Sequence, residues 1–118
     1  MTTNVKAFGI ELTESIKNYA LNKMVRIRKL LSDHNNFHAE IELAKTTAHH
    51  HKGEVFRAEI NMSGVGELYR AEASADDLYA AIDLAKDELV QEIKGRRMRK
   101  ESLFRKGARI AKRLLRIS

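Results

Sequence analysis

The chain has 118 residues, a length that fits one domain with a modest core and a short appendage. It has no Cys, which excludes a disulfide framework, a thiol nucleophile and a cysteine-based zinc site. The net charge of +6 is unevenly distributed, because residues 94–118 hold eleven Lys and Arg against one acid, whereas residues 1–93 hold eleven against fifteen. A cationic segment at the end of a near-neutral chain predicts a polyanionic partner, either nucleic acid or an anionic membrane surface.

The first expected elements are a short strand and a long helix. Residues 4–8 alternate weakly between polar and apolar side chains and predict a strand, which Gly9 ends. Thr13 is a suitable N-cap, and apolar residues then recur at helical spacing as far as Leu31. We therefore expect a helix from about Thr13 to Leu31.

Three strands are expected next. Apolar and polar residues alternate over residues 38–43 and again over residues 56–62. Residues 63–66 offer two glycines for a hairpin turn, and residues 67–73 predict the last strand. This succession predicts an antiparallel meander with one polar face.

The last expected element is a helix that reaches into the basic segment. Ser74 and Asp77 resemble a capping box at its start, and an apolar stripe follows, made of Leu78, Ile82, Ala85, Leu89 and Ile93. Without proline, the helix is expected to continue toward residue 118. The order β-α-β-β-β-α predicts an α+β fold, a four-stranded sheet with two helices packed on one face plus a basic C-terminal extension. We divide the chain into a domain at 1–95 and a basic tail at 96–118.

Basic residues recur along one edge of the first helix. Lys23, Arg26 and Lys29 have the spacing i, i+3, i+6, whereas Lys17 and Arg28 fall on the opposite edge. Two interpretations are open. The cations flank an apolar face with their aliphatic stems, or they form a ladder that follows a phosphate backbone.

The tail has the pattern of a cationic amphipathic helix. Leu103, Ile110 and Leu114 share one face, and cations occupy most of the rest. Such a helix can bind RNA, lie on a membrane or cover the protein's own core. Because its cations repel one another, we expect the free tail to be mobile or partly helical and to become ordered on RNA. The alternative is a tail that is already docked on the sheet.

Consecutive histidines at 49–51, with His34 or His38 nearby, raise the hypothesis of a metal site. Neighbouring loop side chains point in different directions, so an exposed loop tip is the favoured interpretation. No catalytic grouping is recognisable, and we expect neither an enzyme nor a cofactor. No apolar run approaches the roughly 20 residues of a membrane span. The start of the chain has no signal-peptide pattern. We therefore expect a cytoplasmic protein.

Two stretches resemble the family of ribosome hibernation factors, also called sigma-54 modulation proteins. Residues 69–83 (YRAEASADDLYAAID) resemble the family's signature, with Leu78 in place of the usual Met. Residues 10–19 (IELTESIKNY), followed by Lys23, resemble its first helix. The resemblance covers roughly residues 1–95. It implies a protein that occupies the mRNA and tRNA region of the small ribosomal subunit and silences idle ribosomes. It also implies a short form without the C-terminal dimerisation domain.

The resemblance places Lys23, Arg26 and Lys29 at positions that face ribosomal RNA, which favours the ladder. Glu88 and Gln91 stand where the family has basic residues, so the last helix is expected to contribute cations only from residue 94 onward. The expected RNA-binding residues of this region are Lys94, Arg96, Arg97, Arg99, Lys100, Arg105, Arg109 and Arg113.

The expected partners are the small ribosomal subunit and its RNA, and we expect neither DNA nor a membrane as a partner. Off the ribosome we expect the protein to be a monomer. Two other functions are open. One is a general double-stranded-RNA-binding module, since its layout of helices and strands is similar. The other is a membrane-surface protein anchored by its cationic tail.

Overall fold

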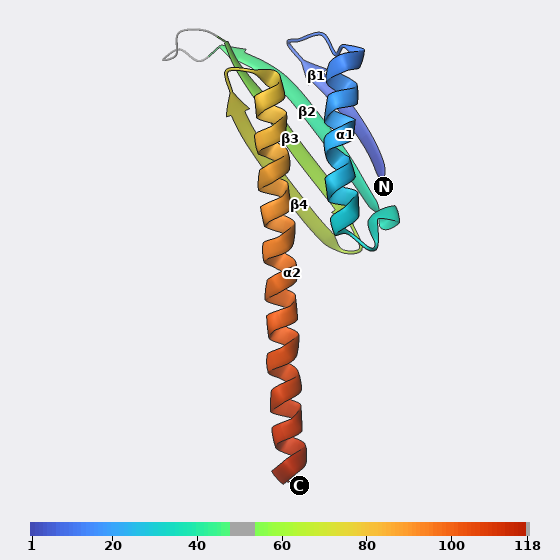
Figure 1. Ribbon diagram of the computed structural model, residues 1–118, viewed down its shortest axis with the longest axis vertical. Helices are drawn as coiled ribbons and strands as arrows, with labels where there is room; N and C mark the ends of the chain where they lie inside the picture. Colours follow the sequence, from blue (N-terminus) through green and yellow to red (C-terminus); the bar gives the residue numbers. More distant parts are fainter. Residues whose placement is uncertain (48–53, 118) are drawn as a thin grey trace.

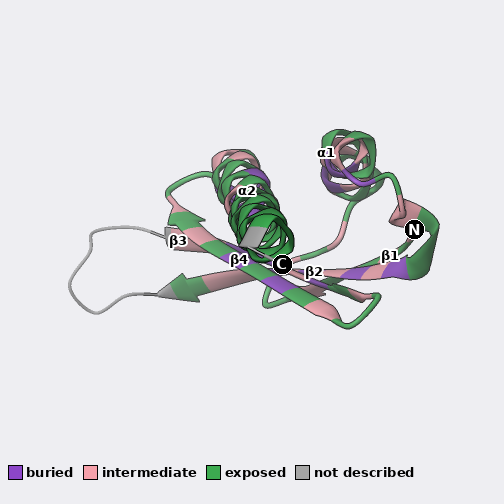
Figure 2. Cartoon of the chain, turned by 90° about the horizontal axis from the view of Figure 1, so that it is seen from below, coloured by how far each residue is buried: buried purple, intermediate pink, exposed green. Residues whose placement is uncertain are grey.

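The structure is a computed structural model that describes residues 1–47 and 54–117. Two helices lie on one face of a four-stranded sheet (Figures 1 and 2). The elements are β1 (Thr2–Phe8), α1 (Glu14–Leu30), a short 3-10 turn η1 (His34–Asn36), β2 (Phe37–Thr47), β3 (Glu54–Gly64), β4 (Glu67–Ala75) and α2 (Leu78–Ile117). The predicted α+β order is therefore confirmed.

The sheet is mixed, in the spatial order β1-β2-β3-β4. β2, β3 and β4 form the predicted antiparallel meander, with Ile41 opposite Ile60 and Ile60 opposite Ala71. β1 pairs in parallel with β2, with Val5 beside Ile41. A parallel pair requires a crossover connection, and α1 supplies it by returning the chain over the sheet.

The core lies between the sheet and the two helices. α1 contributes its buried residues Ala20, Met24 and Ile27, and Thr13 caps it by accepting a hydrogen bond from the N–H of Ile16 at 3.2 Å. The inward residues of the strands and one stripe of α2 complete the core, and they include Ala39, Ile41, Leu43, Ala58, Ile60, Met62, Tyr69, Ala71, Ile82, Ala85, Leu89 and Ile93. The core therefore ends at Ile93, well before the end of α2.

The predicted capping box at Ser74 is wrong. Residue 74 still belongs to β4, where it pairs with Arg57, so it is not free to begin a helix. Asp77 caps α2 instead, because its side chain accepts a hydrogen bond from the N–H of Tyr79 at 3.1 Å. The spacing matched the motif, but the strand ran longer than the alternation predicted.

The turn between β3 and β4 uses its two glycines differently. Gly66 has a φ of 74°, which glycine adopts at little cost, and Val65 precedes it at 48°. Gly64 has an ordinary φ but lies against the start of β2. A Cβ atom there would stand 2.3 Å from the carbonyl oxygen of Asn36 and 2.8 Å from the Cα of Phe37. The close approach of two backbones therefore requires glycine at position 64.

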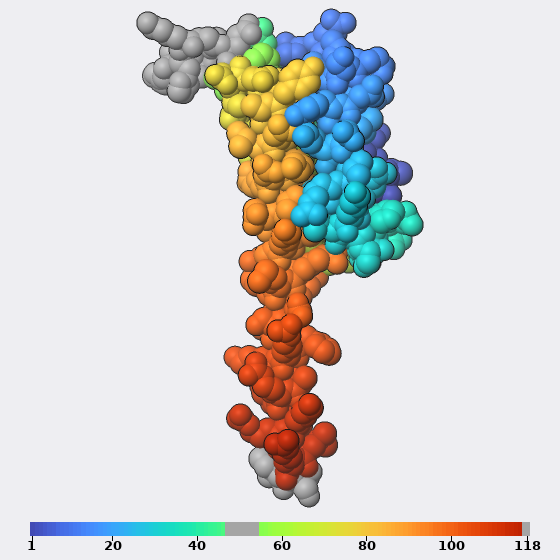
Figure 3. Space-filling model, in the orientation of Figure 1, coloured from blue at the N-terminus to red at the C-terminus, as the bar shows by residue number. Residues whose placement is uncertain are grey.

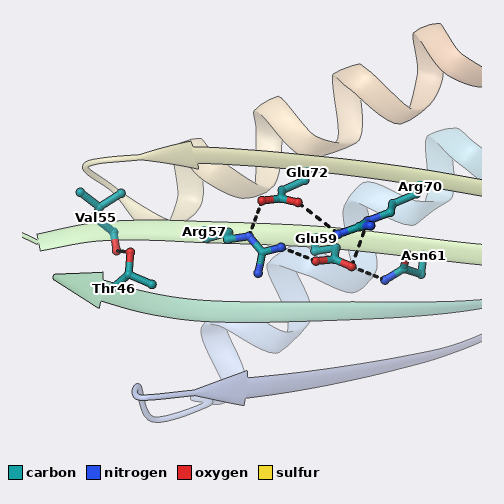
Figure 4. A network of polar contacts seen from close by, with 7 residues as sticks. All are labelled: Thr46, Val55, Arg57, Glu59, Asn61, Arg70 and Glu72. Carbon is teal, nitrogen blue, oxygen red and sulfur yellow. Dashed lines mark hydrogen bonds and ion pairs between the residues drawn. The ribbon is translucent and has the colours of Figure 1, made fainter. Parts of the chain in front are cut away.

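The face of the sheet that the helices leave uncovered carries a network of charged side chains (Figure 4). Arg57 lies 2.5 Å from both Glu72 and Glu59, and Arg70 contacts the same two carboxylates. Asn61 donates to Glu59 at 2.7 Å, and this hydrogen bond is the main cause that lowers the pKa of Glu59. Each arginine of this network is therefore matched by carboxylates and contributes no free positive charge to this face.

α2 continues far beyond the sheet as a single helix (Figures 1 and 3). The molecule is accordingly elongated, with extents of 68 × 33 × 18 Å. Every residue from 98 to 116 is exposed, so the tail does not fold back onto the sheet. The continuation of the helix is as predicted, whereas the order of the tail in solution and the domain boundary at residue 95 stay predictions.

Candidate nucleic-acid interface

The first predicted cation, Lys23, is held in the seam between α1 and α2. Its ammonium lies 3.0 Å from a carboxylate oxygen of Asp83 and 4.7 Å from the centre of the Tyr19 ring. The hydroxyl of Tyr19 donates to both oxygens of Asp83, at 2.8 and 2.9 Å. Tyr79 meets the Tyr19 ring edge-on. Lys23 is therefore a part of the helix–helix contact, and its charge is matched within the protein.

The geometry of this cluster sets the direction in which each pKa is shifted. Burial alone would raise the pKa of Asp83, but the hydrogen bonds from Tyr19 and Lys23 and the charge of Lys23 outweigh it, so this pKa is lowered. The hydrogen bond to Asp83 is also the main cause that raises the pKa of Lys23 and of Tyr19. Sequence reasoning missed this cluster, because Asp83 lies 64 residues from Tyr19.

Arg26 and Lys29 are exposed, and neither has an ion pair among the described residues. Lys29 follows the fully buried Ala20 by nine residues, which is two and a half turns, so it lies opposite the core side of α1. Arg26 lies between that outer side and the edge that carries Lys23. Of the predicted ladder, the structure thus leaves these two residues available to a phosphate.

Three further predicted cations fasten α2 to the end of the sheet. Arg97 lies 3.3 Å from Asp33 and 3.9 Å from Glu67, and Lys100 lies 2.7 Å from Glu67. Arg96 pairs with Glu92 at 2.8 Å, donates to the carbonyl oxygen of Leu68 and lies over the ring of Tyr69. We call Arg96, Arg97 and Lys100 with their partners the latch. Its cations are already engaged, so they are poorer candidates for RNA contact than the sequence indicated.

The other predicted residues of α2 are exposed. Arg105 pairs with Glu101 one turn earlier, while Lys94, Arg99, Arg109 and Arg113 have no ion pair among the described residues. Three more exposed cations accompany them on the tail, at Lys106, Lys112 and Arg116. The spacing of Arg105, Arg109, Lys112 and Arg116 places them on one side of the helix.

Part of this exposed charge lies on one side of the molecule, with Lys29 on α1 and with Lys94, Arg105, Arg109, Lys112 and Arg116 on α2. Both helices cover the same face of the sheet (Figure 2), so the side of α1 that carries Lys29 faces away from the sheet. Lys94 and Lys112 are separated by 18 residues, or five full turns, and Lys94 is exposed on the outer side of α2. The cationic side of the tail therefore continues the outer side of the helix layer, and the arrangement suits an extended polyanion.

A sequence model of the family described as "Sigma 54 modulation protein / S30EA ribosomal protein" matches residues 3–101. The chain belongs to this family. A ribosome hibernation promoting factor of Pseudomonas putida is 26% identical over 108 residues, which cover 92% of this chain and 98% of that protein.

Solved structures agree with the assignment. The N-terminal domain of Protein Y from Thermus thermophilus is 30% identical, with a TM-score of 0.68 over 80% of this chain and 97% of that one. A ribosomal subunit interface protein of Coxiella burnetii has the same fold at 15% identity, with a TM-score of 0.69 over 83% of this chain and 99% of that one.

The family match includes most of the predicted site. Eight of the eleven residues, from Lys23 to Lys100, lie inside the matched range, and Arg105, Arg109 and Arg113 lie beyond its end at residue 101. The signature at residues 69–83 ends at Asp83, the residue that joins α1 to α2. Within this signature, Tyr69 and Asp83 thus have a visible structural role.

The histidines at 49–51 lie outside the described residues. His38 contacts Thr2 at 2.7 Å and Glu40 at 3.5 Å. Among the residues that the structure describes, no group of three or more His, Asp or Glu side chains is placed to hold a metal ion. Within the same residues, neither helix is long and apolar enough to cross a membrane.

Proposed function

We propose that this protein is a cytoplasmic ribosome hibernation factor that binds the small ribosomal subunit as a monomer. It occupies the region that mRNA and tRNA would use, and it blocks translation by occupancy. The observation that carries the proposal is the family match over residues 3–101 together with the exposed cations on the side of the helix layer. The names of the relatives from Pseudomonas putida and Coxiella burnetii support a ribosomal partner.

The mechanism needs no chemical step. Arg26 and Lys29 on α1 and the exposed cations of α2 neutralise phosphates of ribosomal RNA and release condensed counterions. The sheet and the contact of Asp83 with Tyr19 and Lys23 hold the two helices in a fixed relation, so Arg26, Lys29 and Lys94 form a preorganised surface. Lys23 supports this surface indirectly, by fixing α1 against α2.

The test uses purified small subunits loaded with mRNA or with initiator tRNA. Added protein should displace both ligands and slow translation in vitro in the same concentration range. Binding that leaves both ligands in place would remove the occupancy mechanism, although the protein would still be a ribosome-binding protein.

A matched pair of variants tests the assigned surface. Arg26→Glu with Lys29→Glu should weaken subunit binding by roughly tenfold or more, because two phosphate contacts become repulsive. Lys17→Glu with Arg28→Glu changes the charge equally on the opposite edge of the same helix, where both residues are exposed, and should have a much smaller effect. An equal loss of binding in the two double variants would mean that only the net charge of the protein matters, and not the position of these residues. A lower Tm would instead reveal a structural role.

A further inference from the structure

The tail of α2 has a second surface that phosphate binding does not use. Leu103, Phe104, Ile110 and Leu114 are 69%, 78%, 51% and 63% exposed. All four belong to the part of α2 that projects beyond the sheet (Figure 3). We call these four residues the apolar face of the tail.

The direction of this face follows from the straight course of α2 (Figure 1). Eighteen residues make five full turns of an α-helix, so residues 18 or 36 positions apart lie in line. Leu103 is in line with Ala85, and Leu114 is in line with Leu78. Ala85 and Leu78 are both buried in the core. The apolar face therefore continues the side of α2 that forms the core, past the point where the sheet ends.

The cationic side of the tail points the other way. Arg105 is in line with Asp87 and Arg109 with Gln91, and both Asp87 and Gln91 are exposed on the outer side of α2. Arg26 and Lys29 lie on this outer side of the helix layer as well. When these cations bind RNA, the apolar face therefore points away from the RNA and stays exposed to water.

The spacing of the apolar face fits recognition of a helix by a groove. Leu103, Gly107, Ile110 and Leu114 follow one another at intervals of four, three and four residues, which is the repeat of a helix laid in a groove. Gly107 has no atom within 4 Å of the place that a Cβ would take, so a partner backbone can approach closely there. Lys106 and Arg113 border this face, and no acid follows Glu101, so the matching groove needs an acidic rim.

Two other occupants fit less well. A second copy of the tail would bring like charges together along the whole contact, because the segment from Ser102 onward holds six cations and no acid. An anionic membrane would accept both sides of the helix, but it would compete with RNA for the same cations.

We propose that the apolar face of the tail docks in an apolar, acid-rimmed groove of a protein component of the small ribosomal subunit, while the cationic side lies on RNA. This inference rests on the proposed function, and it names a second partner for the same bound protein. The tail then lies between protein and RNA, with its apolar face in contact with the protein and its cationic side in contact with the RNA.

The test compares two positions on opposite sides of the tail. The photoreactive residue p-benzoylphenylalanine replaces either Leu114 or Arg109 in the full chain, which is bound to purified small subunits and irradiated. The probe at position 114 should cross-link to protein, and the probe at position 109 should cross-link to RNA. The inference is overturned if position 114 reaches only RNA, or if it reaches nothing while position 109 reacts.

A pair of substitutions gives an independent measurement. Leu103→Gln with Leu114→Gln retains good helix formers, so circular dichroism should change little. The affinity for small subunits should fall by roughly tenfold or more, because two anchors leave the groove, whereas binding to protein-free ribosomal RNA should stay the same. Equal losses on subunits and on free RNA would overturn the inference.

Two controls separate the ways in which the idea can fail. If the unaltered protein does not sediment with small subunits, the proposed function and this inference fall together. If subunit binding is intact in the Leu103→Gln/Leu114→Gln variant but binding to vesicles of phosphatidylglycerol and phosphatidylcholine is lost, the apolar face is a membrane anchor and the inference alone falls.

Discussion

Asp83 of α2 connects the two helices of this protein through hydrogen bonds and an ion pair. Its carboxylate accepts hydrogen bonds from the hydroxyl of Tyr19 and forms an ion pair with Lys23, so it binds two side chains of α1. The cluster is only partly exposed, which makes an unmatched charge there costly. The three side chains therefore fix the position of α1, and with it the direction of Arg26 and Lys29.

The first prediction concerns this cluster. Asp83→Asn should reduce the free energy of unfolding by roughly 1 kcal/mol, because two hydrogen bonds to a charged acceptor weaken and partial exposure limits the loss. Thermal unfolding should show a Tm that is lower by a few degrees. Asp87→Asn is the control, since Asp87 pairs with Lys86 at a more exposed position of the same helix and its loss should be near zero. Equal changes of Tm in the two variants would mean that the contacts of Asp83 with Tyr19 and Lys23 contribute no more to stability than an exposed ion pair does.

At the scale of elements, the periodicity of apolar residues predicted most helices and strands. Contacts between residues far apart in the sequence could not be predicted in this way. The helix predicted at Thr13–Leu31 is found at Glu14–Leu30, and alternation located β2, β3 and β4. The parallel pairing of β1 with β2 was not predicted, because nothing local marks the partner of an edge strand. The latch was missed for the same reason. Arg97 and Lys100 read as RNA contacts in sequence, and only the fold brings Asp33 and Glu67 to them.

The second prediction concerns the acid sensitivity of the latch. The hydrogen bond from Lys100, followed by the one from Tyr69, lowers the pKa of Glu67 below its ordinary value of 4.5. A carboxyl with a lowered pKa contributes its full stability above the unfolded value and loses it as the pH falls through the folded value. Glu67→Gln should therefore lower the Tm at about pH 6, and the difference from the unaltered protein should narrow toward about pH 3. A difference that is constant over this range would contradict the assignment.

The third prediction concerns the order of the tail. Gly107 lies in the exposed part of α2, and a Cβ there meets nothing within 4 Å. Gly107→Ala should therefore stabilise the local helix by about 0.5–1 kcal/mol. If the free tail is partly helical, amide exchange across residues 103–115 should slow in the variant, while the Tm of the folded core stays the same. Strong protection of the unaltered tail in the absence of RNA would contradict the prediction that it becomes ordered only on binding.

At the scale of the whole molecule, the buried residues of α2 and most of its cations lie in different parts of the helix. The buried cluster ends at Ile93, and the latch ends at Lys100. Six of the cations follow on the part of α2 that projects beyond the sheet, where every residue from 102 to 116 is exposed. The charge count predicted a body and a tail, and the boundary between them stays a prediction, whereas the direction of each side of the tail became visible only from the straight course of α2.

The last prediction uses the salt dependence of binding to measure this division. If the four cations on the outer side of the tail, Arg105, Arg109, Lys112 and Arg116, meet phosphates, removal of residues 102–118 should flatten the slope of log affinity against log salt concentration by roughly three to four units. Replacement of the same four cations by Gln in the full chain should flatten the slope equally, because both changes remove the same counterion release.

The two variants should differ in affinity at high salt, where counterion release contributes least. The Gln variant keeps the apolar face of the tail and should still bind small subunits more tightly than the truncated chain does. Filter binding or sedimentation at several salt concentrations measures both quantities. An unchanged slope in both variants would mean that the tail does not contact phosphates. Equal affinities at high salt would mean that the apolar face contributes nothing to binding, and phosphate contact would then be the whole role of the tail.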